Sequence, residues 1–191
     1  MTGEEKLQRL IDKDDIQERL QDWARAVARK DWDAVRHAFH DEATDAHGTF
    51  EGGITQFVEW QIEHHVGIEQ SVHFIGAPRI EFADPTAVLS ETYVIAFHRY
   101  GVDARSARRD IFGPGTEHEN QPKTSIIAGR YIDRFEKRRE EWRIAKRVTV
   151  FEWIKLENAP WTIPFQPNWT PAKRDGSDPI YDMRREMGLP A

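Results

Sequence analysis

The sequence contains no cysteine among its 191 residues. This absence excludes disulfides, thiolate nucleophiles and cysteine-ligated zinc or iron–sulfur sites. Long apolar runs are also missing: no window approaches the roughly 18 apolar residues of a membrane-spanning helix, and the charged N-terminus offers no signal-peptide core. We therefore expect a cytoplasmic protein with no membrane partner. Its chemistry, if any, would depend on histidine, carboxylate, tyrosine or arginine side chains.

An excess of positive charge is lacking as well. Lysine and arginine total 27 against 33 aspartates and glutamates, and the two signs are mixed along the chain, with a net charge of -6. A nucleic-acid-binding surface needs a basic face, so we expect no nucleic-acid partner. The phosphate-binding, dinucleotide-binding, zinc-protease and nucleophile-elbow motifs are absent. The length fits one domain with a hydrophobic core, followed by a tail.

Three helices are expected in the first third of the chain. Asp14 or Asp15 can cap the first helix, which carries one apolar stripe made of Ile16, Leu20, Trp23, Ala24 and Val27. Asp31 can cap a short second helix that turns Trp32, Val35 and Phe39 inward. Glu51-Gly52-Gly53 breaks the chain before a third helix over about 54–65. These helices are expected to precede the sheet.

Strand patterns begin after Gly67, with segments rich in Val, Ile, Tyr, Phe and Thr. We expect strands at 71–82, 87–100, 124–136 and 142–155, and a mobile loop or lid at 101–123. Helices followed by an antiparallel meander predict an α+β fold, with a curved sheet wrapped on the helices around a conical pocket. Residues 1–155 form the predicted domain. Residues 156–191, rich in proline and aromatic side chains, form an arm packed on the body or on a neighbouring subunit.

His73 lies among Val72, Phe74 and Ile75 in a run that otherwise resembles a buried strand. It is either a satisfied core histidine or a titratable group facing a cavity. If 71–82 and 87–100 form a hairpin, paired residue numbers sum to about 169 or 171, which places His98 opposite His73 or one diagonal away. An odd sum puts both imidazoles on one face of the sheet, so they can point into one space.

The same arithmetic on the 124–136 and 142–155 strands pairs Tyr131 with Arg147 across the sheet. These two residues would form either a second polar pair in the pocket or a cross-strand pair on an outer face. A metal site is the remaining option, because His37 and His40 are three residues apart in an expected helix, with His47, His64 and His65 nearby. Helical histidines in so charged a segment are usually solvated, and no carboxylate-rich spacing supports ligation, so we expect no metal.

Three segments carry a family resemblance: WARAVARKDWDAVRHAFHDEATDAHGTFEGG, VHFIGAPRIEF and AGRYIDRFEKRREEWRIAKR. Over about residues 10–155 they resemble the SnoaL-like branch of the nuclear transport factor 2-like (NTF2-like) superfamily, which includes scytalone dehydratase, hexachlorocyclohexane dehydrochlorinase and bile-acid 7α-dehydratase. The resemblance implies a cone of three helices on a curved, mainly antiparallel sheet. It also implies cofactor-free lyase or isomerase chemistry, and a homo-oligomer in which a trimer is favoured over a dimer.

The resemblance assigns roles to individual residues. His73 falls on the general base of the dehydratase and the dehydrochlorinase, and His98 matches a second active-site histidine. His47 falls near a cavity tyrosine, and Arg147 on another cavity position. We expect the substrate-binding residues to be Val27, His47, Val94, Ala96, Tyr131, Arg147 and Phe151. The family aspartate that orients the histidine is replaced by Ala28, and the preceding tyrosine by Val27. Asp31, His98 or Asp110 could substitute for this aspartate.

These observations leave competing functions open. The leading interpretation is a cofactor-independent lyase or isomerase acting on an apolar, aromatic or polycyclic small molecule, with His73 as base and His98 as acid or hydrogen-bond donor. Elimination of water, loss of formaldehyde and a double-bond shift all remain open. The alternative is a binding module without chemistry, which the loss of the aspartate at Ala28 favours. A third option is an interaction domain that uses its sheet face.

Overall fold

The computed structural model describes residues 1–159 and 165–189. Its first element, α1 (Gly3–Arg29), begins at Thr2, whose hydroxyl accepts a hydrogen bond from the Glu5 amide while the Glu5 carboxylate accepts one from the Thr2 amide. The expected start at Asp14 or Asp15 is therefore wrong, because the helix extends toward the N-terminus through turns whose apolar residues Leu7, Leu10 and Ile11 are exposed. The stripe that begins at Ile16 is confirmed, and its side chains are buried.

Two short helices follow, α2 (Trp32–His37) and α3 (Ile54–His64). Asp31 caps α2 as expected, since its carboxylate accepts a hydrogen bond of 3.1 Å from the Ala34 amide. Strands β1 (Phe39–His47) and β2 (Phe50–Gly53) lie between the two helices, so the expectation that all helices precede the sheet is wrong. The sequence did not indicate β1 as a strand, because its buried positions include the polar residues His40 and Asp45. His40 therefore lies on a strand and not on a helix.

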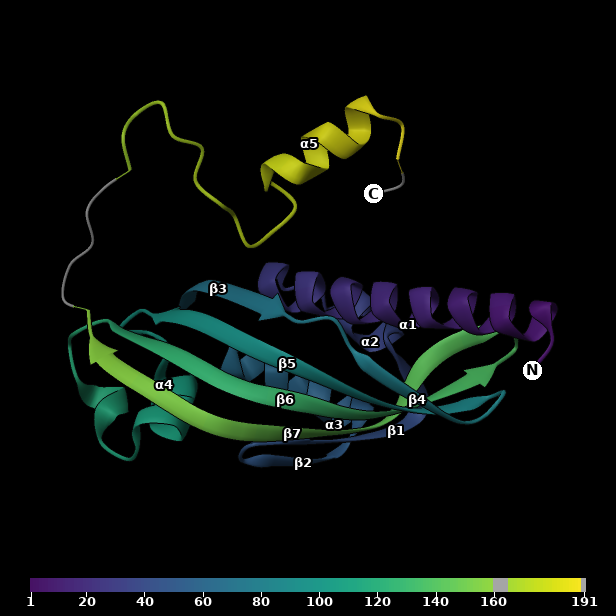
Figure 1. Ribbon diagram of the computed structural model, residues 1–191. Coiled ribbons are helices and arrows are strands. Elements are labelled where there is room, and N and C mark those ends of the chain that lie inside the picture. Colours follow the sequence, from purple (N-terminus) through teal and green to yellow (C-terminus); the bar gives the residue numbers. More distant parts are fainter. Residues whose placement is uncertain (160–164, 190–191) are drawn as a thin grey trace.

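The described residues form a seven-stranded sheet in the order β2-β1-β7-β6-β5-β3, with β4 also paired to β5. The remaining strands are β3 (Ile68–Ile75), β4 (Arg79–Asp84), β5 (Ala87–Tyr100), β6 (Lys123–Arg138) and β7 (Glu141–Asn158). All ladders are antiparallel except β1–β7, which is parallel. Figure 1 shows β5, β6 and β7 curving beneath α1. The α+β cone is thus confirmed.

The expected strand 71–82 is two strands. Residues 76–78, Gly-Ala-Pro, interrupt it, and β3 and β4 each pair with a different part of β5. Proline cannot donate to a strand ladder, which accounts for the break. The next hairpin, β6–β7, turns at Arg139 and Glu140, which both adopt positive φ angles of 52° and 65° as a tight two-residue turn requires.

The segment 101–123, expected as a mobile loop or lid, contains α4 (Arg105–Phe112) and the short 3-10 helix η1 (Thr116–His118), which were not expected. Arg108 anchors the segment. It is fully buried, and its guanidinium donates hydrogen bonds to the carbonyls of Val102 at 3.2 Å and Glu119 at 2.7 Å. The role of the segment as a mobile lid stays a prediction.

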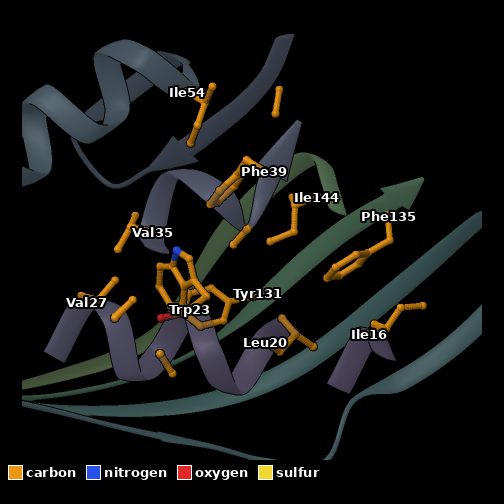
Figure 2. Packing of buried hydrophobic residues seen from close by; sticks show 14 of the residues in the cluster. Ile16, Leu20, Trp23, Val27, Val35, Phe39, Ile54, Tyr131, Phe135 and Ile144 are labelled. Atoms are coloured by element: carbon orange, nitrogen blue, oxygen red, sulfur yellow. The ribbon is translucent and has the colours of Figure 1, made fainter. Parts of the chain in front are cut away.

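The main core lies between α1 and the sheet (Figure 2). Trp23 occupies its centre and packs edge-on against Tyr131 of β6, with ring centroids 5.0 Å apart. Phe39, Phe135 and Ile144 are fully buried around them. This packing fixes α1 on the concave face of the sheet. One end of the cone is left to be closed by smaller and more polar side chains.

The C-terminal segment returns to α1 through Arg174. Its guanidinium donates to the carbonyls of Val27 and Ala28, at the last turn of α1, and to the carbonyl of Ile68. A short helix, α5 (Pro179–Glu186), follows and was not expected. Phe165 and Trp169 contact each other and stay 60% and 58% exposed, while Trp161 lies outside the described residues. β7 continues to Asn158, so the division after residue 155 stays a prediction.

Candidate functional site

A cavity of about 210 Å³ lies between α1, α3 and the concave face of the sheet. Five of the eight histidines of the chain line it: His47, His64, His65, His73 and His98. Its aromatic walls come from Trp23, Trp60, Tyr100 and Phe151. The cavity is therefore an apolar enclosure with an unusual supply of imidazoles.

The expected pairing of His73 and His98 is confirmed. The β3–β5 register places His73 opposite Ala96, so that His98 lies one diagonal away on the same face. The two imidazole centroids are 5.4 Å apart. The ring of Trp23 from α1 packs edge-on against His73, with ring centroids 6.0 Å apart. The period of two along each strand is enough to bring both rings to one wall of the cavity.

Burial keeps these imidazoles uncharged. It lowers the pKa of His73 to about 3, and positive charge at His47 and Arg174 would oppose protonation further. Burial also holds the pKa of His98 well below its usual value, with His73 as the next contribution. Among the described residues, neither ring has a hydrogen-bond partner for its Nδ1 atom. Both are therefore neutral near pH 7 and not fixed in orientation by a neighbouring acceptor.

A cation lies beside Ala28, the position where the family resemblance places an aspartate. Arg174 donates a hydrogen bond of 2.8 Å to the Ala28 carbonyl, and its Nη2 lies 2.9 Å from the Nδ1 atom of His65. Burial lowers the pKa of Arg174 to about 10. The two carboxylates suggested in place of the missing aspartate have other partners. Asp31 caps α2, and Oδ2 of Asp110 lies 3.5 Å from Nδ1 of His64.

His64 and His65 were expected to be solvated, and both are buried. His64 stacks on Trp60 with ring centroids 4.6 Å apart, and burial lowers its pKa to about 4 although the neighbouring Asp110 works in the opposite direction. Burial likewise depresses the pKa of His65. A signal for His64 was present in the sequence. It continues the stripe of Ile54, Phe57 and Gln61 at helical spacing, all buried.

His47 lines the wall formed by β1. Its ring lies among aromatic side chains, with centroids 5.6 Å from Phe57, 6.0 Å from Trp60 and 6.2 Å from Phe151. Its Nδ1 atom is 3.0 Å from the hydroxyl of Thr149 and 3.6 Å from a carboxylate oxygen of Asp45. Sequence reasoning placed His47 in the pocket but did not identify Asp45.

Four expected binding residues lie behind the cavity wall: Val94, Ala96, Tyr131 and Arg147 are buried and outside the lining, whereas Val27 and Phe151 line it. Burial raises the pKa of Tyr131.

The expected pairing of Tyr131 with Arg147 is wrong. Arg138 pairs with Glu141, which already shifts the β6–β7 register by one residue from the expected one, and a bulge between Arg134 and Phe135 shifts it by another. Tyr131 therefore faces Thr149, and Arg147 faces Asp133. Two Arg147 nitrogens donate to the Asp133 carboxylate at 2.7 and 2.8 Å. The guanidinium also lies 4.3 Å from the ring centroid of Tyr131. These contacts give Arg147 a structural role in the core.

No group of three or more histidines and carboxylates in residues 1–159 and 165–189 is arranged to hold a metal ion. His40, one of the residues considered for that role, instead lies with its Nε2 atom 2.9 Å from the carbonyl of Glu136. None of the described helices is long and apolar enough to cross a membrane. The cytoplasmic location stays a prediction.

Comparison with solved structures supports the architecture. A hexachlorocyclohexane dehydrochlorinase of type 2 matches with a TM-score of 0.65 and 16% identity, over 85% of this chain and 98% of the other. A candidate scytalone dehydratase from Novosphingobium aromaticivorans DSM 12444 matches with a TM-score of 0.64 and 14% identity, over 83% and 93%. The beta subunit of a candidate aromatic-ring-hydroxylating dioxygenase from the same organism matches with a TM-score of 0.55 and 13% identity, over 76% and 92%. Such low identities establish the fold alone.

Sequence comparison identifies the family. A search of curated proteins finds no significant match. The family model of the SnoaL-like domain matches residues 8–148, which include most of α1, all of β1, β3 and β5, and most of the β6–β7 hairpin. The chain therefore belongs to the SnoaL-like domain family, with the NTF2-like fold that its sequence resembles.

Proposed function

We propose that this protein is a cofactor-independent lyase or isomerase that acts on an apolar, aromatic small molecule enclosed in the histidine-lined cavity. The observation that carries the proposal is the pair of partly buried imidazoles of His73 and His98, held neutral on one wall of an aromatic cavity. Neutral imidazoles can accept a proton, and an enclosed apolar site excludes water from the reacting atoms.

In this proposal His73 removes a proton from a carbon of the substrate. His98, one diagonal away, donates a hydrogen bond to the leaving hydroxyl. The electron pair of the broken C–H bond forms the new double bond as the C–O bond breaks. The hydroxyl departs as water with the proton that His73 took up, which returns His73 to its neutral form. Because burial holds the pKa of His73 at about 3, proton transfer to this ring requires that negative charge developing on the substrate stabilise the imidazolium.

A second candidate function is ligand binding without chemistry. Two observations favour it: Ala28 offers no carboxylate, and the Nδ1 atom of His73 has no hydrogen-bond partner among the described residues. A base that is neither oriented nor charge-compensated contributes less to catalysis than a paired one. Catalysis would therefore require the ligand itself to orient His73 and to compensate its charge, whereas binding alone would not.

The experiment is a screen of metal-free protein against hydroxylated aromatic and steroid-like compounds, followed by absorbance, with binding measured in parallel. Turnover that falls by about 10² to 10⁴ in kcat in His73→Ala supports the lyase or isomerase. Tight binding of several compounds with no turnover supports the binding module. Activity that His73→Ala preserves within a few-fold rejects His73 as base, and activity abolished by a chelator rejects the metal-free assignment.

We also propose that the protein is a homo-oligomer, with a trimer favoured and a dimer as the alternative. The support is an apolar row on the outer face of β3 and β5. Val72 pairs with Phe97 and Phe74 with Ile95 across these strands, and the four side chains are 43% to 72% exposed. Contiguous exposed apolar side chains of this kind favour association with another surface.

A further inference from the structure

Asp45 of β1 is a buried carboxylate with no satisfied oxygen. It is 1% exposed, and neither Oδ1 nor Oδ2 has a hydrogen-bond partner among the described residues. Burying a polar group without a compensating hydrogen bond is unfavourable, and the cost is larger for a charge. The equally buried Asp133 differs, because both its oxygens accept hydrogen bonds from Arg147. Asp45 therefore needs an explanation other than packing.

The charges around Asp45 do not balance. It lies opposite Arg147 in the β1–β7 ladder, but that guanidinium already forms a bidentate ion pair with Asp133. Two carboxylates around one arginine leave one negative charge without a counterion. On the cavity side, Nδ1 of His47 lies 3.6 Å from Oδ1 of Asp45, on the same face of the strand and two residues along.

This arrangement selects one tautomer of His47. If Nδ1 carried a lone pair, that lone pair would face the negative charge of Asp45. A proton on Nδ1 removes this repulsion and provides a donor toward Asp45 and toward the Thr149 hydroxyl, which is 3.0 Å away. The hydrogen must then be absent from Nε2 of the neutral ring. His47, a cavity-lining residue, accordingly keeps an accepting lone pair on Nε2.

The surroundings of His47 define what can approach that lone pair. Trp60 and Phe151 line the cavity beside the ring, and Phe57 lies against it. A flat aromatic ligand fits such walls, and a hydroxyl on it can donate to Nε2. We propose that Asp45 positions His47 as the acceptor for the acidic hydroxyl of a phenol-type ligand. The phenol proton moves to Nε2, leaving a phenolate, and the imidazolium charge lies beside the carboxylate of Asp45.

This inference rests on the proposed function for its cavity, but it concerns ligand recognition and can be tested without turnover. The probes are 2-naphthol and its ether 2-methoxynaphthalene, which has no O–H to donate. Dissociation constants are measured by equilibrium dialysis on the full chain. The wild type should prefer 2-naphthol by about tenfold or more, the range of one charge-assisted hydrogen bond. His47→Phe should abolish the preference, and Asp45→Asn should reduce it roughly threefold or more, since the amide retains an acceptor but loses the charge.

A variant that still binds 2-methoxynaphthalene keeps a folded cavity. His37→Gln, which replaces an exposed histidine outside the cavity, is the matched control. The role of Asp45 has a separate readout. Nitrogen NMR of the unliganded protein should place the His47 proton on Nδ1, and in Asp45→Leu on Nε2. A proton on Nε2 in the wild type overturns the inference. Equal affinity for the two probes, or no binding of either, also overturns it. Equal affinity would leave the lyase proposal standing on its own kinetic test.

Discussion

Mild acidification should destabilise this protein, because four histidines of the cavity, His64 and His65 buried and His73 and His98 partly buried, are held as neutral imidazoles. The pKa is about 3 for His73 and about 4 for His64, and burial depresses it well below 6.5 for His65 and His98. In the unfolded chain each ring recovers a pKa near 6.5. Below that pH these imidazoles bind protons in the unfolded state but stay unprotonated in the folded state. The contribution of each ring to the free energy of unfolding is therefore fully present above about pH 6.5, and it is lost as the pH falls toward the pKa of the folded state.

The magnitude follows from proton linkage. One pKa unit corresponds to about 1.4 kcal/mol, and between about pH 7.5 and 5.5 the unfolded imidazole passes from mostly neutral to mostly charged. Each of the four rings should then cost about 1.4 kcal/mol over this interval, or about 5 kcal/mol together. A domain is typically stable by only about 5–15 kcal/mol. The nearby Asp110 reduces the share of His64, because its charge favours the imidazolium.

The assay is urea unfolding followed by tryptophan fluorescence at about pH 7.5, 6.5 and 5.5, where most carboxylates stay ionised. The free energy of unfolding should fall across the series. His73→Leu should recover about 1.4 kcal/mol of the loss at the lowest pH, relative to its own value at the highest. His118→Gln, which changes a side chain 79% exposed, should recover none. Equal stability at all three pH values would refute the assignment of these rings as buried and neutral.

Three further changes have defined outcomes. Arg147→Met should lower the free energy of unfolding by about 3–5 kcal/mol, because it leaves the Asp133 carboxylate buried and unpaired; the double variant with Asp133→Leu should regain much of that loss in the same urea assay. Ala28→Asp should raise the pKa of His73 by about 1–3 units in an imidazole NMR titration; no change would mean that the new carboxylate does not reach the ring. Phe97→Glu should dissociate the oligomer in sedimentation, unless the outer sheet face is not the interface.

Local patterns in the sequence determined the parts of the fold that depend on neighbouring residues. The stripe from Ile16 to Val27 identified the buried face of α1, and the alternation around His73 and His98 identified one wall of the cavity. Both predictions rest on the fixed periods of 3.6 and 2 residues, which hold wherever the helix or strand is placed. The arithmetic for one hairpin also gave the diagonal contact of the two imidazoles, although β4 lies between β3 and β5 in the chain and the contact belongs to the separate β3–β5 ladder.

Only the tertiary structure decided the rest of the site, because its contacts join segments far apart in the chain. His47 meets Thr149 from β7, and Arg174 reaches Ala28 and His65 from the C-terminal segment. No local period encodes such pairings, and the position of the β6–β7 turn together with one bulge changed the expected partner of Arg147. Sequence determined which side chains share a face. Long-range packing decided which of them are buried together, and burial is what sets their charge.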